Sequence, residues 1–362
     1  MQETSKPVIS LLVPIYNVER YLYQCLESAR TQTFTDIEVI CINDGSTDGS
    51  RDVIAGFMER DTRFKCIDKP NSGYGASMNR GLAEAQGDYI AILESDDFFT
   101  PDALEKLLAN AVAFNAEVVK ANFYFYWSVP TERTEFFELL TPDMTGRLVN
   151  PQKETRIFYQ KPSIWSALYQ RDFLRSNEIN FLETPGASYQ DAGFSFKAWA
   201  CATRVAFLHE GILYYRQDNE ASSVNSPGKV YCVCDEYAEM KRYLDERPEK
   251  KASLSTLLVK MRYDSYMWNY ERLNEPLKCE FIKRFSEDFQ LEEEQGMIDY
   301  RLFEPWKIDD LKVILKDPEA FHTQREAGER KESIIRKSLY YLRIGGIPRL
   351  ANAVKQRLAS RR

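Results

Sequence analysis

Short polar clusters follow three apolar runs of the sequence, and their residue types suit the binding of a phosphorylated ligand. The apolar runs are residues 8–15, 37–42 and 89–93. The clusters that follow them are Tyr16-Asn17 with Glu19, Asn43-Asp44-Gly45-Ser46 and Glu94-Ser95-Asp96-Asp97. Gathered carboxylates repel one another, so a structural role alone explains them poorly. Hard oxygen ligands of this kind suit Mg²⁺ or Mn²⁺, especially a cation shared with a diphosphate.

The apolar runs are predicted strands, and helices are predicted between them. A continuous apolar run such as VISLLVPI (residues 8–15) is typical of a strand buried on both faces. Asp48 is a candidate N-cap for a helix through Arg60, and Pro101 opens another helix. The complete set of predicted strands is residues 8–15, 37–42, 64–67, 89–93 and 117–121. These β–α repeats predict an α/β fold with a mostly parallel sheet flanked by helices, and ligands bind at the carboxyl ends of such strands.

Two common nucleotide-binding motifs are absent. The sequence contains no G-x-x-x-x-G-K-[ST], so a P-loop is excluded. No G-x-G-x-x-G follows the first predicted strand, and the similar string Gly73-Tyr74-Gly75 lies later with the wrong spacing. A nucleotidyltransferase would need a glycine-rich basic loop after that strand, where PIYNVERYL stands instead. The polar clusters therefore belong to another class of α/β protein.

Residues 7–125 resemble the catalytic domain of family 2 glycosyltransferases, which have the GT-A fold. The strings that carry the resemblance are VISLLVPIYNVERYLYQCLESARTQTF, EVICINDGSTDGS, NSGYGASMNRGLAEAQGDYIAILESDD and TPDALEKL. Each string is short, but their order and spacing are specific. The resemblance implies an inverting transfer of a sugar from a nucleoside diphosphate, usually UDP, assisted by a divalent metal.

The resemblance also implies donor-binding residues. Tyr16 either lies against the base or is an aromatic residue at the rim of the site. Asp44 either accepts a hydrogen bond from the uracil ring or stabilises an Asx turn. Gly73 lets backbone approach the ligand, and Asn79 is either a donor-site residue or a structural hydrogen-bonder. The complete set is Pro14, Tyr16, Asn17, Glu19, Asp44, Asn71, Gly73, Asn79, Glu94, Ser95, Asp96 and Arg216.

Glu94-Ser95-Asp96 stands where the family has its D-x-D motif. By this resemblance Asp96 coordinates the Mn²⁺ or Mg²⁺ that bridges the diphosphate. The first position is Glu instead of Asp, which leaves open whether Glu94 contacts ribose or metal. Arg216 is expected to reach the diphosphate.

Asp191 is the candidate general base, because Gln190-Asp191 stands where the family has its E-D motif. It would take the proton of the acceptor hydroxyl, or it is only a helix N-cap. An ordinary Asp pKa of about 3.9 makes a weak base, so burial is expected to raise it. Gln190 replaces the usual Glu. Gln190 and Trp165 are predicted acceptor contacts, although Trp165 is equally a candidate core residue.

Composition limits the location of the protein. The formal net charge of −7 argues against a nucleic-acid binder. The N-terminus lacks the pattern of a signal peptide, and no apolar stretch is long enough to span a membrane. Seven scattered cysteines suit free thiols in a reducing compartment. We expect a cytoplasmic protein.

The basic C-terminus is the exception to this acidity. Residues 330–362 hold ten Lys or Arg and one acid, Glu332, a local charge of +9, so the other residues carry −16. Apolar residues recur at helical spacing there, which is typical of a helix on an anionic membrane surface at the inner face of the cell membrane. Packing on the protein's own body or on a partner subunit is the alternative.

The predicted organisation has three parts. Residues 1–226 form the GT-A catalytic domain, with a nucleotide-binding half (7–125) and an acceptor half (126–226); residues 227–329 form a helical domain, and 330–362 the basic tail. The predicted activity is the building of a bacterial surface glycan on a glycan or lipid-linked acceptor. The alternative is a scaffold protein with a decayed transferase site. The sequence leaves open the sugar, the linkage and whether the chain forms a homo-oligomer.

Overall fold

The computed structural model describes residues 6–186, 188–219, 229–329 and 337–343, together with residues 346, 350, 351 and 354. The chain divides into two compact units, Met1–Ser265 and Tyr266–Arg362. The division falls inside one long helix, α8 (Pro248–Arg272). The domain boundaries drawn from the sequence remain a prediction.

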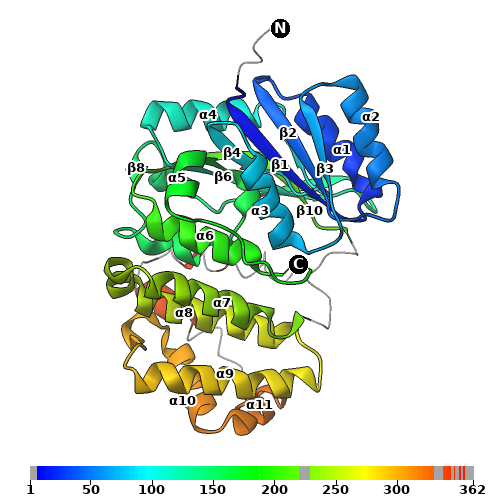
Figure 1. Ribbon diagram of the computed structural model, residues 1–362. Coiled ribbons are helices and arrows are strands. Elements are labelled where there is room, and N and C mark those ends of the chain that lie inside the picture. The colour runs from blue at the N-terminus through cyan, green and yellow to red at the C-terminus, as the bar shows by residue number, and fades with distance from the viewer. Residues whose placement is uncertain are drawn as a thin grey trace. The chain divides into compact units, whose positions relative to one another are not determined.

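A ten-stranded sheet forms the centre of the first unit, with the order β3-β2-β1-β4-β9-β6-β10-β5 (Figure 1). β7 pairs with β6 at its side, and β8 pairs with β10. β1, β2, β3, β4, β6 and β10 all run in one direction, whereas β9 is antiparallel to both β4 and β6. The predicted mostly parallel sheet is confirmed.

The strands form where the sequence is continuously apolar. The strand bounds are β1 (Ile9–Ile15), β2 (Ile37–Asn43), β3 (Phe64–Asp68), β4 (Tyr89–Ile92), β5 (Phe98–Phe99), β6 (Val118–Trp127), β7 (Arg133–Phe137), β8 (Leu148–Val149), β9 (Ala167–Gln170) and β10 (Val205–Arg216). Every residue of β1 and β2 is buried, as expected for strands covered on both faces. Their register places Ile15 beside Asn43, so both strands end at the same edge.

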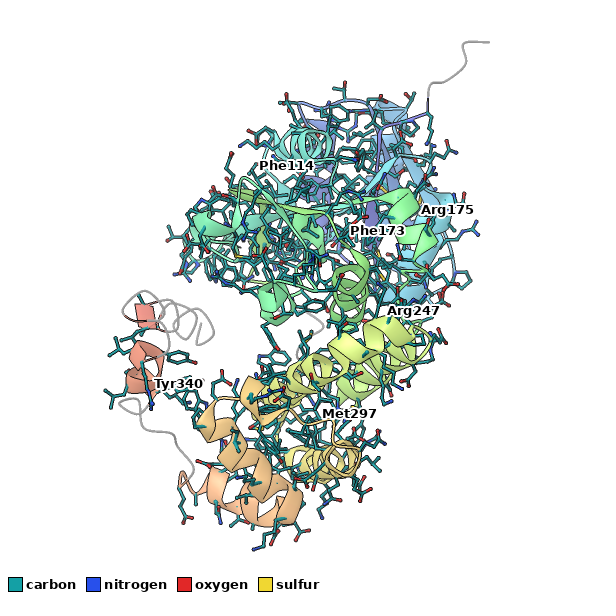
Figure 2. All side chains as sticks on the ribbon, turned by 90° about the vertical axis from the view of Figure 1, so that its left-hand side faces the viewer. Phe114, Phe173, Arg175, Arg247, Met297 and Tyr340 are labelled. Carbon is teal, nitrogen blue, oxygen red and sulfur yellow. The ribbon has the colours of Figure 1, made fainter. Side chains whose placement is uncertain are left out.

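Helices cover both faces of this sheet. The helices of this part are α1 (Glu19–Arg30), α2 (Ser50–Arg60), α3 (Tyr74–Glu84), α4 (Ala103–Phe114), α5 (Arg171–Ser176) and α6 (Gln190–Cys201). α1 and α2 lie behind the strands in Figure 1 and α3 lies in front, as right-handed crossovers require when the chain reverses direction across β1. Side chains fill the space around the sheet, including Phe114 of α4 and Phe173 of α5 (Figure 2).

The start of α2 differs from the sequence prediction. Gly49, not Asp48, occupies the N-cap position. The Asp48 carboxylate instead accepts from the backbone N–H of Glu19 and of Ser50, both at 3.0 Å. Asp48 therefore joins the loops after β1 and β2.

The irregular middle contains the 3₁₀ turns η1 (Pro142–Met144), η2 (Thr155–Tyr159) and η3 (Ile164–Ser166). α7 (Cys232–Asp245) and the first part of α8 complete the first unit. The part of the chain between β6 and α6 thus mixes short strands with 3₁₀ turns. The seven cysteines are free thiols.

The second unit is helical. It contains the end of α8, then α9 (Leu277–Glu294), η6 (Tyr300–Leu302), α10 (Pro305–Lys316) and α11 (Pro318–Glu326). Phe281, Phe285 and Phe289 are fully buried at helical spacing along α9 and pack around Tyr266. This spacing explains why α9 folds as an amphipathic helix.

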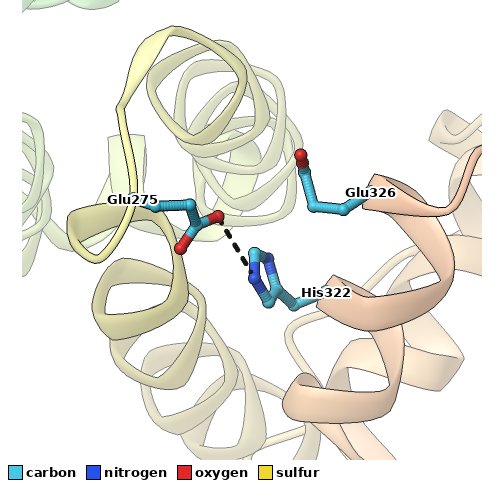
Figure 3. Close-up of side chains that lie close together, drawn as sticks. All are labelled: Glu275, His322 and Glu326. Atoms are coloured by element: carbon cyan, nitrogen blue, oxygen red, sulfur yellow. Dashed lines mark ion pairs between the residues drawn. The ribbon is translucent and has the colours of Figure 1, made fainter.

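Both histidines have partners. His209 Nε2 lies 3.0 Å from Glu138 Oε1. His322 Nε2 lies 3.2 Å from Glu275 Oε1, and its Nδ1 lies 2.9 Å from the Tyr270 hydroxyl (Figure 3). Glu326 completes this cluster of three possible ligands, but it is paired with Lys278. Ion pairs account for the cluster without a metal.

The basic tail lies mostly outside the described residues. Residues 337–343 are helical, and the rings of Tyr340 and Tyr341 lie 5.2 and 6.0 Å from that of Trp306 on α10. Leu339 is 61% exposed. Among the described residues, no helix is both long enough and apolar enough to cross a bilayer.

Candidate active site

The loops after β1 and β2 are tied together by hydrogen bonds. The Asn17 side-chain oxygen accepts from Thr47 N at 2.7 Å, and Asn17 N donates to Ser46 Oγ at 3.1 Å. Asn17 has a φ of 49°, a left-handed conformation that asparagine tolerates. Glu19 accepts from Gly49 N. Of the predicted donor contacts here, Tyr16 (53% exposed), Asn17 and Glu19 are exposed, and Pro14 is buried within β1.

Asp44 is buried and anchors the segment before α3. Its carboxylate accepts from Ser72 N at 2.9 Å and from Gly73 N at 3.0 Å, and it pairs with Lys69. These bonds place the neighbouring Asn71, which is exposed, at the rim of the site. The predicted contact of Asp44 with uracil would have to share these oxygens.

Gly73 and Asn79 have a different setting from the one that the resemblance implies. Gly73 has a φ of +92°, and a Cβ there would lie 2.7 Å from the Thr184 carbonyl oxygen. The close approach is therefore to the chain's own backbone. Asn79 Nδ2 donates to Phe181 O and to Glu183 Oε1, both at 2.9 Å. These contacts favour the structural alternative for Asn79, and they fix α3 against the segment that leads to Asp191.

Glu94 and Asp96 follow β4 in a partly buried position, as does Ser95 between them. Glu94 Oε1 accepts from the Tyr74 hydroxyl at 2.6 Å. Burial, opposed by the Tyr74 hydrogen bond and reinforced by the charges of Asp96 and Asp191, raises the pKa of Glu94 to about 8. Asp96 Oδ2 accepts from Asn219 at 2.8 Å. The acids after β4 and at the start of α6 thus share one electrostatic environment.

Arg216 is a buried connector at the end of β10. Its backbone N–H donates to Asp97 at 2.8 Å, and its Nε donates to the Asp96 carbonyl oxygen at 2.9 Å. Its Nη2 donates to Gln24 at 2.6 Å. Arg216 is only 5% exposed, so the structure gives it the role of holding the turn after β4. A contact with the diphosphate remains a prediction.

Asp191 lies in the first turn of α6. Burial raises its pKa to about 6, while Lys161 and Lys120 oppose this rise. The Asp191 carboxylate accepts from Ala192 N at 2.9 Å. A carboxylate of this pKa is ionised at neutral pH and yet more basic than an ordinary Asp, which suits a general base.

Two lysines near Asp191 were not singled out by the sequence. Lys120 of β6 is buried, and its Nζ donates to Ser163 Oγ at 2.7 Å, to Ser166 Oγ at 2.8 Å and to the Ser163 carbonyl. It fixes the turn η3. Lys161 is exposed, and its Nζ lies 5.1 Å from the centre of the Tyr215 ring. A lysine within an apolar strand sequence (EVVKA) was the available signal for Lys120.

The two predicted acceptor contacts are buried. Trp165 is 6% exposed and packs against Phe123 and Tyr215 with ring centres 4.6 and 4.8 Å away. Gln190 is 2% exposed, and its Nε2 donates to Thr184 Oγ1 at 2.9 Å. Both side chains therefore pack in the interior beneath the site. Trp165 lies where a core residue would lie, which was the alternative to an acceptor contact.

The chain resembles bacterial glycosyltransferases in sequence. EpsJ of Bacillus subtilis strain 168, named an uncharacterized glycosyltransferase, is 31% identical over 217 residues, which are 59% of this chain and 62% of EpsJ. Glycosyltransferase GlyG of Streptococcus pneumoniae is 29% identical over 219 residues, which are 58% of this chain and 71% of GlyG. The chain thus spans about three-fifths of the length of EpsJ.

A solved structure confirms the fold. The crystal structure of S. aureus TarS 1–349 matches with a TM-score of 0.66 at 19% identity and covers 88% of this chain and 91% of that one. This likeness confirms the predicted GT-A architecture with a helical C-terminal region. The model of the family "Glycosyl transferase family 2" matches residues 10–166, which include the clusters after β1, β2 and β4. Over these residues the chain is therefore similar to glycosyl transferase family 2.

Proposed function

We propose that the chain is an inverting glycosyltransferase that moves a sugar from a UDP-sugar to a hydroxyl of a glycan or lipid-linked acceptor. The observation that carries the proposal is the position of Asp191, a carboxylate with a pKa raised to about 6 by burial and coupled to Glu94. A decayed scaffold would have no need to keep a basic carboxylate beside the acids after β4.

The chemistry requires Asp191 to be ionised when the acceptor binds. Its carboxylate takes the proton of the acceptor hydroxyl as that oxygen attacks the anomeric carbon. The new C–O bond forms on the face opposite the leaving nucleoside diphosphate, whose bond to the anomeric carbon breaks. The configuration at that carbon is therefore inverted.

Asp96 is the residue that fits a divalent cation. It is partly exposed, and its Oδ1 accepts no hydrogen bond from any described residue. One free carboxylate oxygen together with diphosphate oxygens and water suits Mg²⁺ or Mn²⁺. Bound there, the ion would supply charge neutralisation for the departing diphosphate. Arg216 and Asn219 hold Asp96 in place through its carbonyl and its carboxylate.

The choice of UDP draws on the fold neighbour and on the rim of the site. S. aureus TarS 1–349 was solved in complex with UDP and with UDP-GlcNAc. In this chain the exposed ring of Tyr16 and the buried carboxylate of Asp44 lie after β1 and β2, where the base would bind. UDP-GlcNAc is the first donor to test.

A screen of nucleotide sugars tests the proposal. The full chain is incubated with UDP-GlcNAc, UDP-glucose, UDP-galactose or GDP-mannose, with Mn²⁺ or with EDTA, and release of the nucleoside diphosphate is measured. We expect metal-dependent release of UDP from one or more of the UDP-sugars. The absence of release from all of them, in a protein that is folded by circular dichroism, would contradict the proposal.

The proposed cellular place of this reaction is the inner face of the cell membrane. A lipid-linked acceptor lies at that surface, and residues 330–362 carry a charge of +9. Attraction to anionic lipid is worth about 1 kcal/mol per basic residue near the surface. The tail would bring the acidic body of the enzyme to its acceptor.

A further inference from the structure

A row of aromatic side chains leads away from Asp191 along one face of β6 and β10. Strand residues alternate between the two faces of a sheet, and the rings of this face belong to Phe123, Phe125 and Trp127 of β6 and to Tyr215 of β10. Phe125 lies 6.1 Å from Tyr215 and 6.1 Å from Trp127 between ring centres. The row is continuous, because each ring contacts the next.

The burial of this row changes along its length. Phe123 is fully buried and packs against Trp165, so this end belongs to the core. Tyr215, Phe125 and Trp127 are only partly buried, although the Arg133 guanidinium covers one face of the Trp127 ring with its carbon 3.9 Å from the ring centre. Aromatic rings that remain partly exposed beside a reaction site have an apolar face available for a ligand.

The inner end of the row lies at the catalytic acids. Tyr215 directly precedes Arg216, whose backbone N–H donates to Asp97 at 2.8 Å. Burial, together with the negative charges of Asp97, Asp96, Asp191 and Glu94, raises the pKa of Tyr215. Lys161 is exposed, its Nζ lies 5.1 Å from the centre of the Tyr215 ring, and this Nζ has no hydrogen-bond or ion-pair partner among the described residues. A sugar hydroxyl that reaches Asp191 must therefore lie beside Tyr215 and Lys161.

We propose that Tyr215, Phe125 and Trp127 form the acceptor platform, on which successive sugar rings of a glycan acceptor stack while Lys161 donates to their hydroxyls. The inference rests on the proposed function and adds to it the residues that hold the acceptor. The apolar faces of pyranose rings match exposed aromatic faces, and the flexible Lys161 supplies a polar contact at the reacting end. Trp165 supports this platform from behind.

The opposite face of the same strands provides a matched control. Tyr124 and Tyr214 are also partly buried, pair directly with one another and stack at 5.1 Å between ring centres. They alternate with Phe125 and Tyr215, so they point to the opposite face of the sheet. A substitution at Tyr124 therefore perturbs the same strand without touching the platform.

A printed glycan array, probed with the full chain in UDP and Mn²⁺, tests the platform. Wild-type protein is expected to bind a subset of the glycans. Phe125→Leu and Trp127→Leu should each lower the signal on that subset at least about fivefold, whereas Tyr124→Leu should leave it within about twofold. Leucine keeps an apolar side chain but removes the aromatic face, and a thermal melt of each variant identifies any loss of folding.

The same variants are assayed for hydrolysis of the UDP-sugar without acceptor. We expect Phe125→Leu and Trp127→Leu to retain wild-type hydrolysis, because the platform lies outside the donor side of the site. Unchanged array binding in both variants, an equal loss in Tyr124→Leu, or no glycan bound by the wild type would overturn the platform. Loss of hydrolysis in the wild type would instead contradict the proposed transferase.

Discussion

At the scale of single residues, burial decides which carboxylates do chemistry. Asp97 and Asp191 are both aspartates near strand or helix ends, but Asp97 is fully buried and accepts from a backbone N–H, whereas Asp191 is partly exposed. The sequence identified Asp191 through its resemblance to a motif. It could not identify Lys120 as a support, because the partner of Lys120, Ser163, lies 43 residues away.

The raised pKa of Asp191 predicts the pH dependence of turnover. The base works only when ionised, so kcat/KM should fall as the pH drops through about 6, the value to which burial raises the Asp191 pKa. An unshifted Asp would keep full activity down to about pH 4. The check is a pH profile of UDP-sugar hydrolysis, and a flat profile between pH 5 and 7.5 would argue against Asp191 as the base.

At the scale of elements, the apolar runs predicted β1, β2 and β4 to within one residue at each end, because strands buried on both faces need little context. The roles of Trp165, Gln190 and Arg216 could not be predicted in this way. Trp165 and Arg216 contact segments distant in sequence, as when Arg216 Nη2 donates to Gln24, and the Gln190 side chain is held by the loop before α6. Tertiary contacts, not local pattern, decided whether these side chains face a ligand.

The contact between α3 and residues 182–186 gives a prediction about packing. A Cβ at Gly75 would overlap the Leu182 carbonyl oxygen, whereas a Cβ at Gly56 of α2 meets only the end of the Arg60 side chain at 3.8 Å. Gly75→Ala should therefore destabilise the protein by more than about 2 kcal/mol, and Gly56→Ala should stabilise it by about 0.5–1 kcal/mol through helix propensity. Urea unfolding of both variants measures this, and equal effects would contradict the close approach.

The packing of α7 on α6 predicts a pH-dependent stability. Glu236 is 1% exposed, neither of its carboxyl oxygens has a hydrogen-bond partner among the described residues, and it fills the space that Gly193 leaves. Burial raises its pKa from 4.5 to about 9, and the charge of Asp191 adds to the rise. The folded state holds this proton more tightly than the unfolded state, so stability falls by about 1.4 kcal/mol per pH unit between pH 4.5 and about 9.

Glu236→Gln removes that titration. The variant should gain thermal stability over wild type at pH 8 and little at pH 5, as measured by Tm. Glu239→Gln on the same helix is the control. Burial raises the pKa of Glu239, but hydrogen bonds from Arg242 and Lys197 lower it below its ordinary value. Because the ionised carboxylate is stabilised in the folded state, Glu239→Gln should lower Tm at pH 8. A Glu236→Gln variant that is less stable at pH 8 would show that the carboxylate has a partner.

At the scale of the whole molecule, charge separates a catalytic body from a basic tail. Residues 330–362 carry +9. In the described part of the tail, Tyr340 contacts Trp306, but Leu339 is 61% and Leu342 is 38% exposed. The contact of Tyr340 with Trp306 agrees with packing of the tail on the protein's own body. The exposed Leu339 and Leu342 agree with binding to a membrane surface.

Deleting residues 330–362 should abolish binding to vesicles that contain phosphatidylglycerol without changing UDP-sugar hydrolysis. Leu339→Ser/Leu342→Ser keeps the charge and should weaken binding partly, since apolar burial adds to the electrostatic attraction. Vesicle sedimentation at low and high salt measures both variants. Equal binding by the deleted and complete chains would assign the tail to the protein's own body.

The role of Asp191 as general base is tested most directly by one substitution. Asp191→Asn keeps the shape of the side chain and removes its basicity. We expect UDP-sugar turnover to fall at least about 100-fold, while the Kd for UDP, measured by calorimetry with Mn²⁺, stays within about twofold of wild type. Full turnover in a folded Asp191→Asn variant would contradict the account.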